Sequence, residues 1–271
     1  MAFRRPPSGP APAPAPPDRT ARPLKAALIA LTTLIVALAA APGASADPLV
    51  VGVEPQNYLP HFGWVAGRYV GFGAEVLEAW ARDEGHTLTY HAFPIPRLMQ
   101  RLVVGAIDLK YPAAPEWNPA DKQGAAVMYS DVIVRSRIGT YVRPEALGAP
   151  AEGVRSLGVL IGFAPRPWRS WTDAGLTVLR PNKDLQGLVR QGLTGRVDAI
   201  YVNADVLARI LIEDLHRPGA LVMDTGLPHQ PDRYHAASVT RPDLIASLNR
   251  WIRTNQARLE AMRQAHGVGQ Y

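Results

Sequence analysis

The 271-residue sequence contains no cysteine. This absence excludes disulfide bonds, thiolate metal sites, a cysteine nucleophile and a lipid-anchored N-terminal cysteine. The catalytic signatures G-x-S-x-G and H-E-x-x-H and the phosphate-binding P-loop are also missing. The seven histidines do not form a recognisable zinc-binding motif. The residues therefore predict no catalytic group, no metal site and no cofactor.

Lysine is scarce as well. Only four of the 29 basic residues are lysines, namely Lys25, Lys110, Lys122 and Lys183. Two of them lie close together around the stretch 107-IDLKYPAAPEW-117. In a chain whose usual cation is arginine, this pair indicates that the segment requires an ammonium group rather than a guanidinium group. Chance clustering of two lysines is the simpler alternative.

Residues 1–46 have the order of a secretory signal peptide. Five basic residues and one acid precede a 16-residue apolar run at 26–41, and 44-ASA-46 offers a cleavage site before Asp47. The run is shorter than the roughly 20 residues that a transmembrane helix needs. We therefore expect cleavage and a periplasmic or secreted protein, with an uncleaved N-terminal anchor as the alternative.

The charge of the cleaved chain is close to neutral. Removing the leader leaves 225 residues (271 − 46), with 24 basic (29 − 5) and 22 acidic (23 − 1) side chains, or a net charge of +2. This balance gives no reason to expect binding to nucleic acid or to an anionic membrane.

The first half of the cleaved chain alternates strands and helices. Residues 49–53 read as a buried strand, and 74–85 have the apolar spacing of a helix ending at Gly85. Residues 87–93 alternate like a strand, a helix follows Pro96, and 107–109 form the next strand. This order predicts a mainly parallel sheet, whose ligands bind beyond the carboxyl ends of the strands.

The second half repeats this order. Strands are expected at 156–161 and 197–202, helices at 183–193 and 205–212, and a long helix or helix pair at 241–265. The two halves are similar in size and in their alternation of strands and helices. The pattern predicts two α/β lobes rather than one barrel, with Lys110, Tyr111 and Trp117 on a stiff loop at a strand end, where a ligand would bind.

Six short motifs follow one another along the chain: 51-VGVEP-55, 71-GFGAEVLEA-79, 104-VGAIDL-109, 129-YSDVIV-134, 157-LGVLIG-162 and 195-GRVDAIYVN-203. In this order and spacing they resemble family 3 of the bacterial extracellular solute-binding proteins, the periplasmic receptors of amino-acid ABC importers. The resemblance implies an α/β fold, the two-lobed periplasmic binding protein type II fold with a hinge of two crossover strands. It places lobe 1 at 47–135 and 236–271, lobe 2 at 136–235, and the crossovers near 130–138 and 234–239.

Three positions depart from the family's pattern. Gly73 stands where members usually carry an acid, and no arginine follows the third strand to grip a ligand carboxylate. Asn203 stands where members carry the carboxylate that binds the ligand's ammonium group. An α-amino acid ligand is therefore in doubt. Lys110 and Lys122, without a matching carboxylate, favour an anionic or polyhydroxylated solute.

The predicted ligand-binding residues are aromatic, cationic or placed on cleft loops. Aromatic rings can form stacking walls, and a cation at a helix start, such as Arg97, needs a partner. The full set is Tyr58, Phe62, Trp64, Arg97, Lys110, Tyr111, Trp117, Lys122, Phe163 and Asn203. The structural alternatives are a Lys110–Glu116 ion pair, packing of the rings in the hinge or lobe rim, and a solvated Lys122. Asp108 and Asp198 are expected to fix sheet ends instead.

The resemblance implies a binding protein that closes on a small polar solute, amino-acid-like or anionic, and delivers it to an ABC permease. We expect a monomer without enzyme activity. One alternative is an exported enzyme on the same scaffold, similar to cyclohexadienyl dehydratases, for which Glu54, Glu116 and His61 are the candidate acids or bases. The other is a sensory partner that presents its ligand-closed state to a membrane receptor.

Overall fold

The computed structural model describes residues 1, 9–14, 48–117, 119–122 and 124–269. The chain separates into two compact units, Met1–Ala46 and Asp47–Tyr271, and the elements described below all belong to the second unit. The predicted signal peptide falls almost entirely outside the described residues. Among the helices of the described residues, none has the length and apolar character to cross a membrane.

One curled sheet runs through the second unit. Eight strands follow in the spatial order β4 (Leu88–Ala92), β1 (Leu49–Val53), β5 (Leu109–Ala113), β12 (Gln230–Ser238), β7 (Val134–Val142), β10 (Ala199–Asn203), β8 (Ser156–Leu160) and β9 (Val178–Asn182). Two short strands add to it, β6 (Met128–Tyr129) beside β12 and β11 (Val222–Met223) beside β7. A separate hairpin pairs β2 (Gly63–Val65) with β3 (Arg68–Val70).

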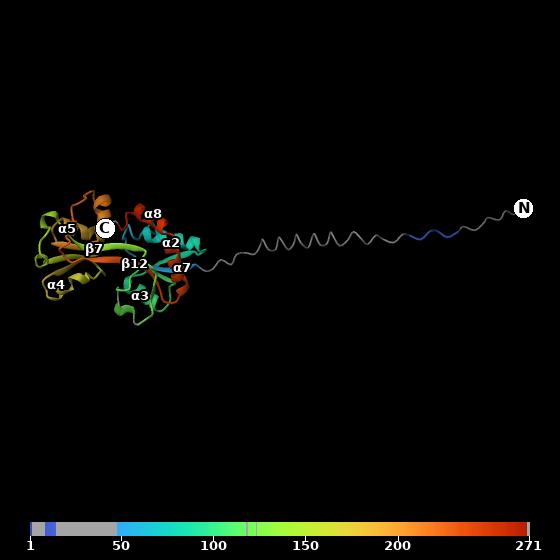
Figure 1. Ribbon diagram of the computed structural model, residues 1–271, viewed down its shortest axis with the longest axis horizontal. Coiled ribbons are helices and arrows are strands. Elements are labelled where there is room, and N and C mark those ends of the chain that lie inside the picture. The colour runs from blue at the N-terminus through green and yellow to red at the C-terminus, as the bar shows by residue number, and fades with distance from the viewer. Residues whose placement is uncertain (2–8, 15–47, 118, 123, 270–271) are drawn as a thin grey trace. The chain divides into compact units, whose positions relative to one another are not determined.

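The two ends of the sheet have the predicted parallel pairing. Strands β4, β1 and β5 are parallel at one end, and β10, β8 and β9 are parallel at the other. Between them lie the two nine-residue strands β7 and β12, which are antiparallel to each other. Figure 1 shows them side by side through the middle of this unit. They divide the sheet into a first half and a second half, as the sequence predicts.

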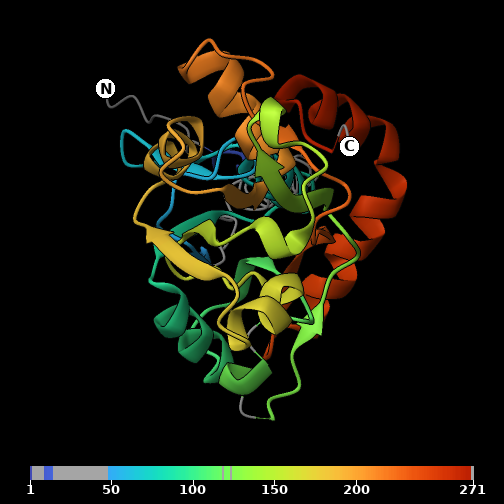
Figure 2. The same cartoon turned by 90° about the vertical axis from the view of Figure 1, so that its left-hand side faces the viewer.

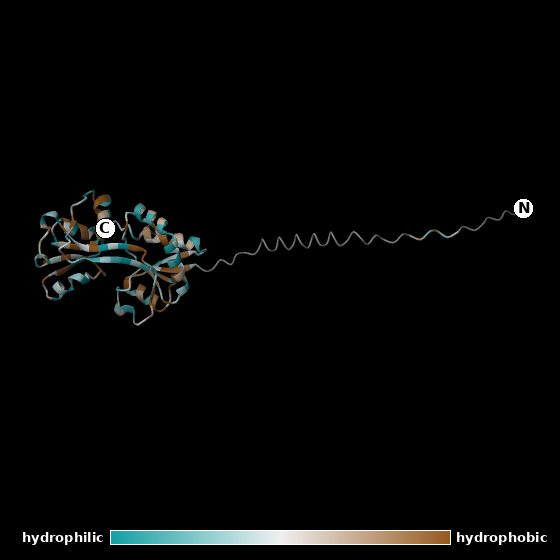
Figure 3. Cartoon of the chain, viewed as in Figure 1, coloured by the Kyte–Doolittle hydropathy of each residue, from teal (hydrophilic) through white to brown (hydrophobic). Residues whose placement is uncertain are grey.

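Four helices cover the first half: α2 (Phe72–Asp83), α3 (Ile95–Val103), α7 (Pro242–Thr254) and α8 (Gln256–His266). Helix α2 buries Val76, Leu77 and Trp80, whose spacing predicts this inward face. The predicted C-terminal helix is a pair, interrupted at Asn255. Figure 2 shows these two helices along one side of the unit, and Figure 3 shows that the ribbon of α8 is coloured mostly as hydrophilic.

The second half carries shorter helices. They are α4 (Arg169–Asp173), α5 (Leu185–Leu193) and α6 (Ala204–Arg209), which a π-helical turn at Ile210–Asp214 extends. The core of the second half includes Trp168, Leu188 and Ile200, which are all fully buried. Short 3₁₀ turns lie at Pro119–Lys122, Pro144–Ala146, Ala151–Gly153 and Arg166–Trp168.

Two aspartates fix sheet ends, as predicted. Asp108 accepts a hydrogen bond from the Val50 amide at 2.8 Å and pairs with Arg241 at 3.0 Å. Asp198 accepts from the amides of Arg155 and Ser156 at 3.0 and 2.8 Å. The lobe boundaries at 135/136 and 235/236 stay a prediction.

The strand predicted at 107–109 is wrong in its position, and so is the loop after it. Strand β5 begins at Leu109 and continues to Ala113, because β1 pairs with it on one side and β12 on the other. Lys110 and Tyr111 therefore lie in a central strand and are buried, with Lys110 only 2% exposed. The loop that carries Trp117 starts after Ala113.

Candidate ligand-binding site

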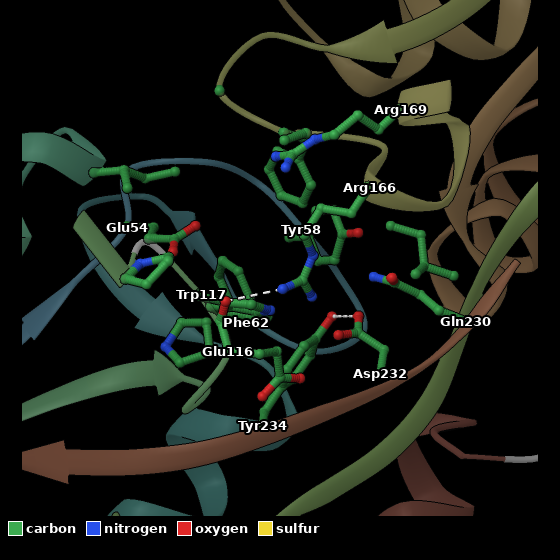
Figure 4. Close-up of a pocket in the computed structure, with 17 residues that line it drawn as sticks. Glu54, Tyr58, Phe62, Glu116, Trp117, Arg166, Arg169, Gln230, Asp232 and Tyr234 are labelled. Carbon is green, nitrogen blue, oxygen red and sulfur yellow. Dashed lines mark hydrogen bonds between the residues drawn. The ribbon is translucent and has the colours of Figure 1, made fainter. Parts of the chain in front are cut away.

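A cavity of about 280 Å³ opens between the two halves of the unit. Its volume lies near the small end of the roughly 300–1,000 Å³ range of small-molecule sites. The first half contributes strand-end and loop residues, the second half contributes the segment after β8, and β7 and β12 supply the rest (Figure 4). The charged, polar and aromatic lining residues are Glu54, Tyr58, Phe62, Glu116, Trp117, Phe163, Arg166, Arg169, Gln230, Asp232 and Tyr234.

Five aromatic rings line the cavity and are called its aromatic wall. Tyr58 stacks on Phe62 with ring centroids 5.3 Å apart, and on Phe163 of the opposite half at 5.5 Å. Trp117 meets Tyr234 edge-on at 5.6 Å. Such rings offer large flat surfaces to a ligand and a negative face to a cation.

Two buried carboxylates face this aromatic wall. Glu54 is 4% exposed and follows the end of β1, and Asp232 is 6% exposed on β12. Burial raises the pKa of Glu54, while nearby Lys110 opposes that rise and Asp232 adds to it. Burial likewise raises the pKa of Asp232, although hydrogen bonds from Tyr234 and Asn203 oppose this shift. Both carboxylates would be stabilised by a cation in the cavity.

Two arginines enter the cavity from the second half. Arg166 is half-buried and donates a hydrogen bond to the backbone oxygen of Glu116 in the first half at 2.8 Å, as Figure 4 shows. Arg169 is exposed at the start of α4. Together with the Tyr58–Phe163 stack, the Arg166 contact joins the two halves across the cavity.

A buried polar network lies beneath the wall. The Asn203 side-chain amide donates to Ser136 at 3.1 Å and to Tyr234 at 3.3 Å, and its oxygen accepts from the amide of Asp205 at 2.9 Å at the start of α6. His61 Nε2 lies 3.1 Å from the Asn203 oxygen and 3.2 Å from Asp205 Oδ2. The network thus connects the first half, both long strands and the second half.

Replacing Asn203 with alanine is expected to destabilise the protein by about 2 kcal/mol, because it removes a helix cap and leaves buried partners without hydrogen bonds. Chemical denaturation measures this change as a lower midpoint with an unchanged slope. Asn249→Ala serves as the control, because Asn249 is half-buried and accepts one hydrogen bond, from the Asp131 amide. Equal losses in the two variants would contradict a special role for the network.

Four of the ten predicted ligand residues line the cavity: Tyr58, Phe62, Trp117 and Phe163. Three others are buried among protein partners. Asn203 belongs to the network above, Tyr111 packs against Gly73, and Lys110 donates a hydrogen bond to the carbonyl of Pro112. Ligand contact by any of the ten stays a prediction.

The remaining three do not line the cavity. Trp64 donates to the backbone oxygen of Glu54 from β2 at 3.2 Å, and Arg97 lies over the Phe93 ring at 5.8 Å. Lys122 is half-buried, donates to the carbonyl of Pro115 and lies 5.3 Å from the Tyr129 ring centroid.

The expectation that Lys110 has no matching carboxylate is wrong, because its Nζ lies 4.0 Å from Glu54 Oε1. The alternative pairing with Glu116 is not the one observed. Burial lowers the pKa of Lys110, and the Glu54 carboxylate opposes this shift. The ion pair forms because β1 and β5 are neighbours and bring both residues to the same end of the sheet.

Sequence reasoning missed four of the residues that line the cavity. Asp232 and Tyr234 lie on the return strand β12, which the sequence identifies only as a crossover. Arg166 and Arg169 follow Phe163 in 163-FAPRPWRS-170, where two arginines flank a Pro-Trp pair. That pattern, a rigid turn with two cations beside a predicted cleft residue, is the signal that could have found them.

The sequence matches no family model and no curated protein. Solved structures with the same fold do match. The substrate-binding protein of an amino acid ABC transporter is 17% identical, with a TM-score of 0.60 over 80% of this chain and 98% of that one. An ancestral amino acid-binding protein, a precursor of cyclohexadienyl dehydratase, is 17% identical, with a TM-score of 0.61 over 81% and 95%.

A histidine kinase sensor domain with similarity to periplasmic binding proteins is also 17% identical, with a TM-score of 0.66 over 83% of this chain and 98% of that one. At such identities the likeness shows the fold alone. The chain has the two-lobed α/β fold of periplasmic binding proteins, as the sequence predicts.

Proposed function

We propose that this protein captures a small polar solute carrying a positive group and delivers it to an ABC permease. The observation that carries the proposal is the pair of buried carboxylates, Glu54 and Asp232, in an aromatic cavity between the two halves. Buried carboxylates are costly unless a cation or hydrogen-bond donors compensate them. A bound cation would supply that compensation.

The placement of the cavity supports capture by hinge closure. Its lining comes from both halves and from the two long strands that connect them. A ligand that touches both walls binds the closed arrangement more tightly than the open one, and so shifts the population toward it. The cross-cavity contacts of Arg166 and Phe163 are the ones that closure would form.

The transport role rests on likeness to proteins of known type, together with the leader-like segment at 1–46. On this proposal the protein acts in the periplasm, as a monomer that a permease recognises in its closed form. The contacts revise the expected ligand. The lysines favoured an anionic solute, whereas the buried carboxylates of the cavity favour a cationic or zwitterionic one.

An exported enzyme remains a second candidate, because Glu54 lines the cavity and has a raised pKa, as a general acid requires. The other two candidates fit less well, since Glu116 is exposed and His61 is buried in the polar network. Turnover of a prephenate-like substrate, lost in Glu54→Gln, would favour this alternative over simple binding.

A screen of amino acids, amines, organic acids and sugars by thermal denaturation tests the proposed function. At 100 times its dissociation constant, a ligand stabilises the folded protein by about 2.7 kcal/mol, which raises Tm by roughly 5–10 °C in a protein of this size. We expect such a shift from cationic members of the panel. A panel without any saturable Tm shift would refute a solute-binding role.

A further inference from the structure

We infer that the ligand is recognised through its cationic head alone, so that an organic amine or guanidine without a carboxylate binds as well as the corresponding amino acid. This inference rests on the proposed solute-binding function and goes beyond it, because it names the chemical class of the ligand. It follows from the partners of the two carboxylates, from the aromatic walls and from the positions of the arginines.

Glu54 has unused hydrogen-bonding capacity. Neither of its carboxylate oxygens accepts a hydrogen bond from a described residue, although the side chain is 95% buried. Lys110 does not fill this role, because its Nζ lies 4.0 Å away and donates to the carbonyl of Pro112. A buried carboxylate that lines a cavity without a donor is a site for a ligand N–H group.

Asp232 also has a carboxylate oxygen that is free to accept a hydrogen bond. Its Oδ2 atom accepts from the Tyr234 hydroxyl at 2.8 Å and from Asn203 at 3.4 Å, which fixes the orientation of the carboxylate. Its Oδ1 atom accepts no hydrogen bond from the described residues. Both Asp232 and Glu54 line the same cavity as the Tyr58 ring. The two free acceptors therefore serve one small region.

The aromatic wall suits the same kind of head group. Tyr58, Phe62 and Phe163 stack in a row, and Trp117 meets Tyr234 beside them. A cation within about 6 Å of such a ring face is stabilised, and more so where water is excluded. Carboxylates and ring faces together recognise an ammonium or guanidinium group on a flat or apolar body.

The cations of the cavity are poorly placed to require a ligand carboxylate. Arg166 is half-buried and already donates to the backbone of Glu116, and Arg169 is exposed. Solvent-exposed ion pairs contribute little to binding. A ligand carboxylate near the exposed Arg169 would therefore add little, whereas loss of the positive head would leave the free acceptor atoms of Glu54 and Asp232 without a hydrogen-bond donor.

Two matched sets of compounds test this inference by isothermal titration calorimetry. One set is arginine, agmatine and 5-guanidinopentanoate, and the other is phenylalanine, 2-phenylethylamine and 3-phenylpropanoate. Within each set the amino acid is compared with its decarboxylated and its deaminated forms. In at least one set, we expect the amine to bind within about threefold of the amino acid or more tightly. In the phenylalanine set, removal of the amine should weaken binding at least 100-fold.

Binding by an amino acid but not by its decarboxylated form would overturn the inference and leave the proposed function intact. Binding by 3-phenylpropanoate at the affinity of phenylalanine would overturn it as well. If all six compounds and the wider panel fail to bind, the proposed function fails, and the inference falls with it.

Site variants separate this recognition from general damage. Glu54→Gln keeps the shape of the side chain and should weaken agmatine or 2-phenylethylamine at least tenfold. Glu152→Gln is the matched control, because Glu152 is exposed in a short 3₁₀ turn and does not line the cavity, and its effect should stay within about threefold. Circular dichroism confirms that both variants are folded. Equal affinity in Glu54→Gln and the unaltered protein would overturn the assignment of Glu54.

Discussion

Replacing Gly73 with aspartate is expected to leave little folded protein at 37 °C. A Cβ atom at this position would lie 2.1 Å from Tyr111 Cε1, far inside any real contact, and 2.7 Å from the hydroxyl. Tyr111 is fully buried on β5, which β1 and β12 flank, so its ring has little room to move aside. The substitution adds steric overlap and a buried, unpaired charge, which together cost more than about 4 kcal/mol.

The same contact explains why the chain departs here from the acid usual in the family it resembles. Because Gly73 has no side chain, the Tyr111 ring can occupy the space beside it. Gly73→Asp with Tyr111→Ser should therefore be more stable than Gly73→Asp alone, and the coupling is measured by a double-mutant cycle with denaturant.

Gly153→Asp is the matched control for backbone effects, because Gly153 lies in a short 3₁₀ turn with no atom within 4 Å of an added Cβ. Its stability should change by less than about 0.5 kcal/mol. A folded Gly73→Asp protein with unchanged Tm would show that Tyr111 does not fill this space.

Replacing Asp232 with asparagine is expected to weaken an amine ligand at least 100-fold, equivalent to about 2.7 kcal/mol, while raising the Tm of the unliganded protein. Asparagine can still accept from Tyr234 and Asn203 through its oxygen, so the network survives. The variant loses the buried negative charge that a cation would have balanced. Isothermal titration calorimetry and thermal denaturation measure the two effects.

The gain in stability should depend on pH. Because the folded-state pKa of Asp232 is raised, the folded protein binds this proton more tightly than the unfolded chain. The stabilisation that this bound proton gives the folded protein is fully present below the pKa of the unfolded chain, about 3.9, and is lost as pH rises through the pKa of the folded state. The Tm advantage of Asp232→Asn should thus be largest near neutral pH, by about 2 °C or more, and shrink on acidification.

Asp173→Asn at the exposed end of α4 is the control and should show no such pH-dependent difference. An advantage of Asp232→Asn that grows as pH falls would contradict the assigned direction of the pKa. Ligand binding that survives the substitution would remove Asp232 from the site.

Much of the architecture could be predicted from apolar spacing. The faces of α2 and α5, the parallel strands at each end of the sheet and the helix pair at the C-terminus follow from periodicity, because each element buries one side. Strand β5 was misplaced because Lys110, Tyr111 and two prolines read as a loop. Its pairing on both edges, which no local pattern shows, overrides that composition.

The site could be predicted only in part. Tyr58, Trp117 and Phe163 follow strands, so the rule that ligands lie beyond strand ends was enough to place them at the cavity. Asp232 lies inside a long crossover strand, and its position depends on how β12 crosses between the halves. The pairing of Glu54 with Lys110 depends on the register of β1 and β5, which connects residues 56 positions apart (110 − 54).

The central claim is that the two halves close on a solute held between them. Spin labels at Ala120→Cys and Ser170→Cys test it most directly, because both residues are exposed and adjoin the cavity residues Pro119 and Arg169 on opposite halves. The chain has no native cysteine, so both labels are site-specific. A Glu152→Cys and Ser170→Cys pair within the second half serves as the control.

Double electron–electron resonance should show that a saturating amine ligand shortens and narrows the distance distribution of the cross-cavity pair and leaves the control pair unchanged. A cross-cavity distribution that stays the same at a ligand concentration that raises Tm would contradict closure of the two halves.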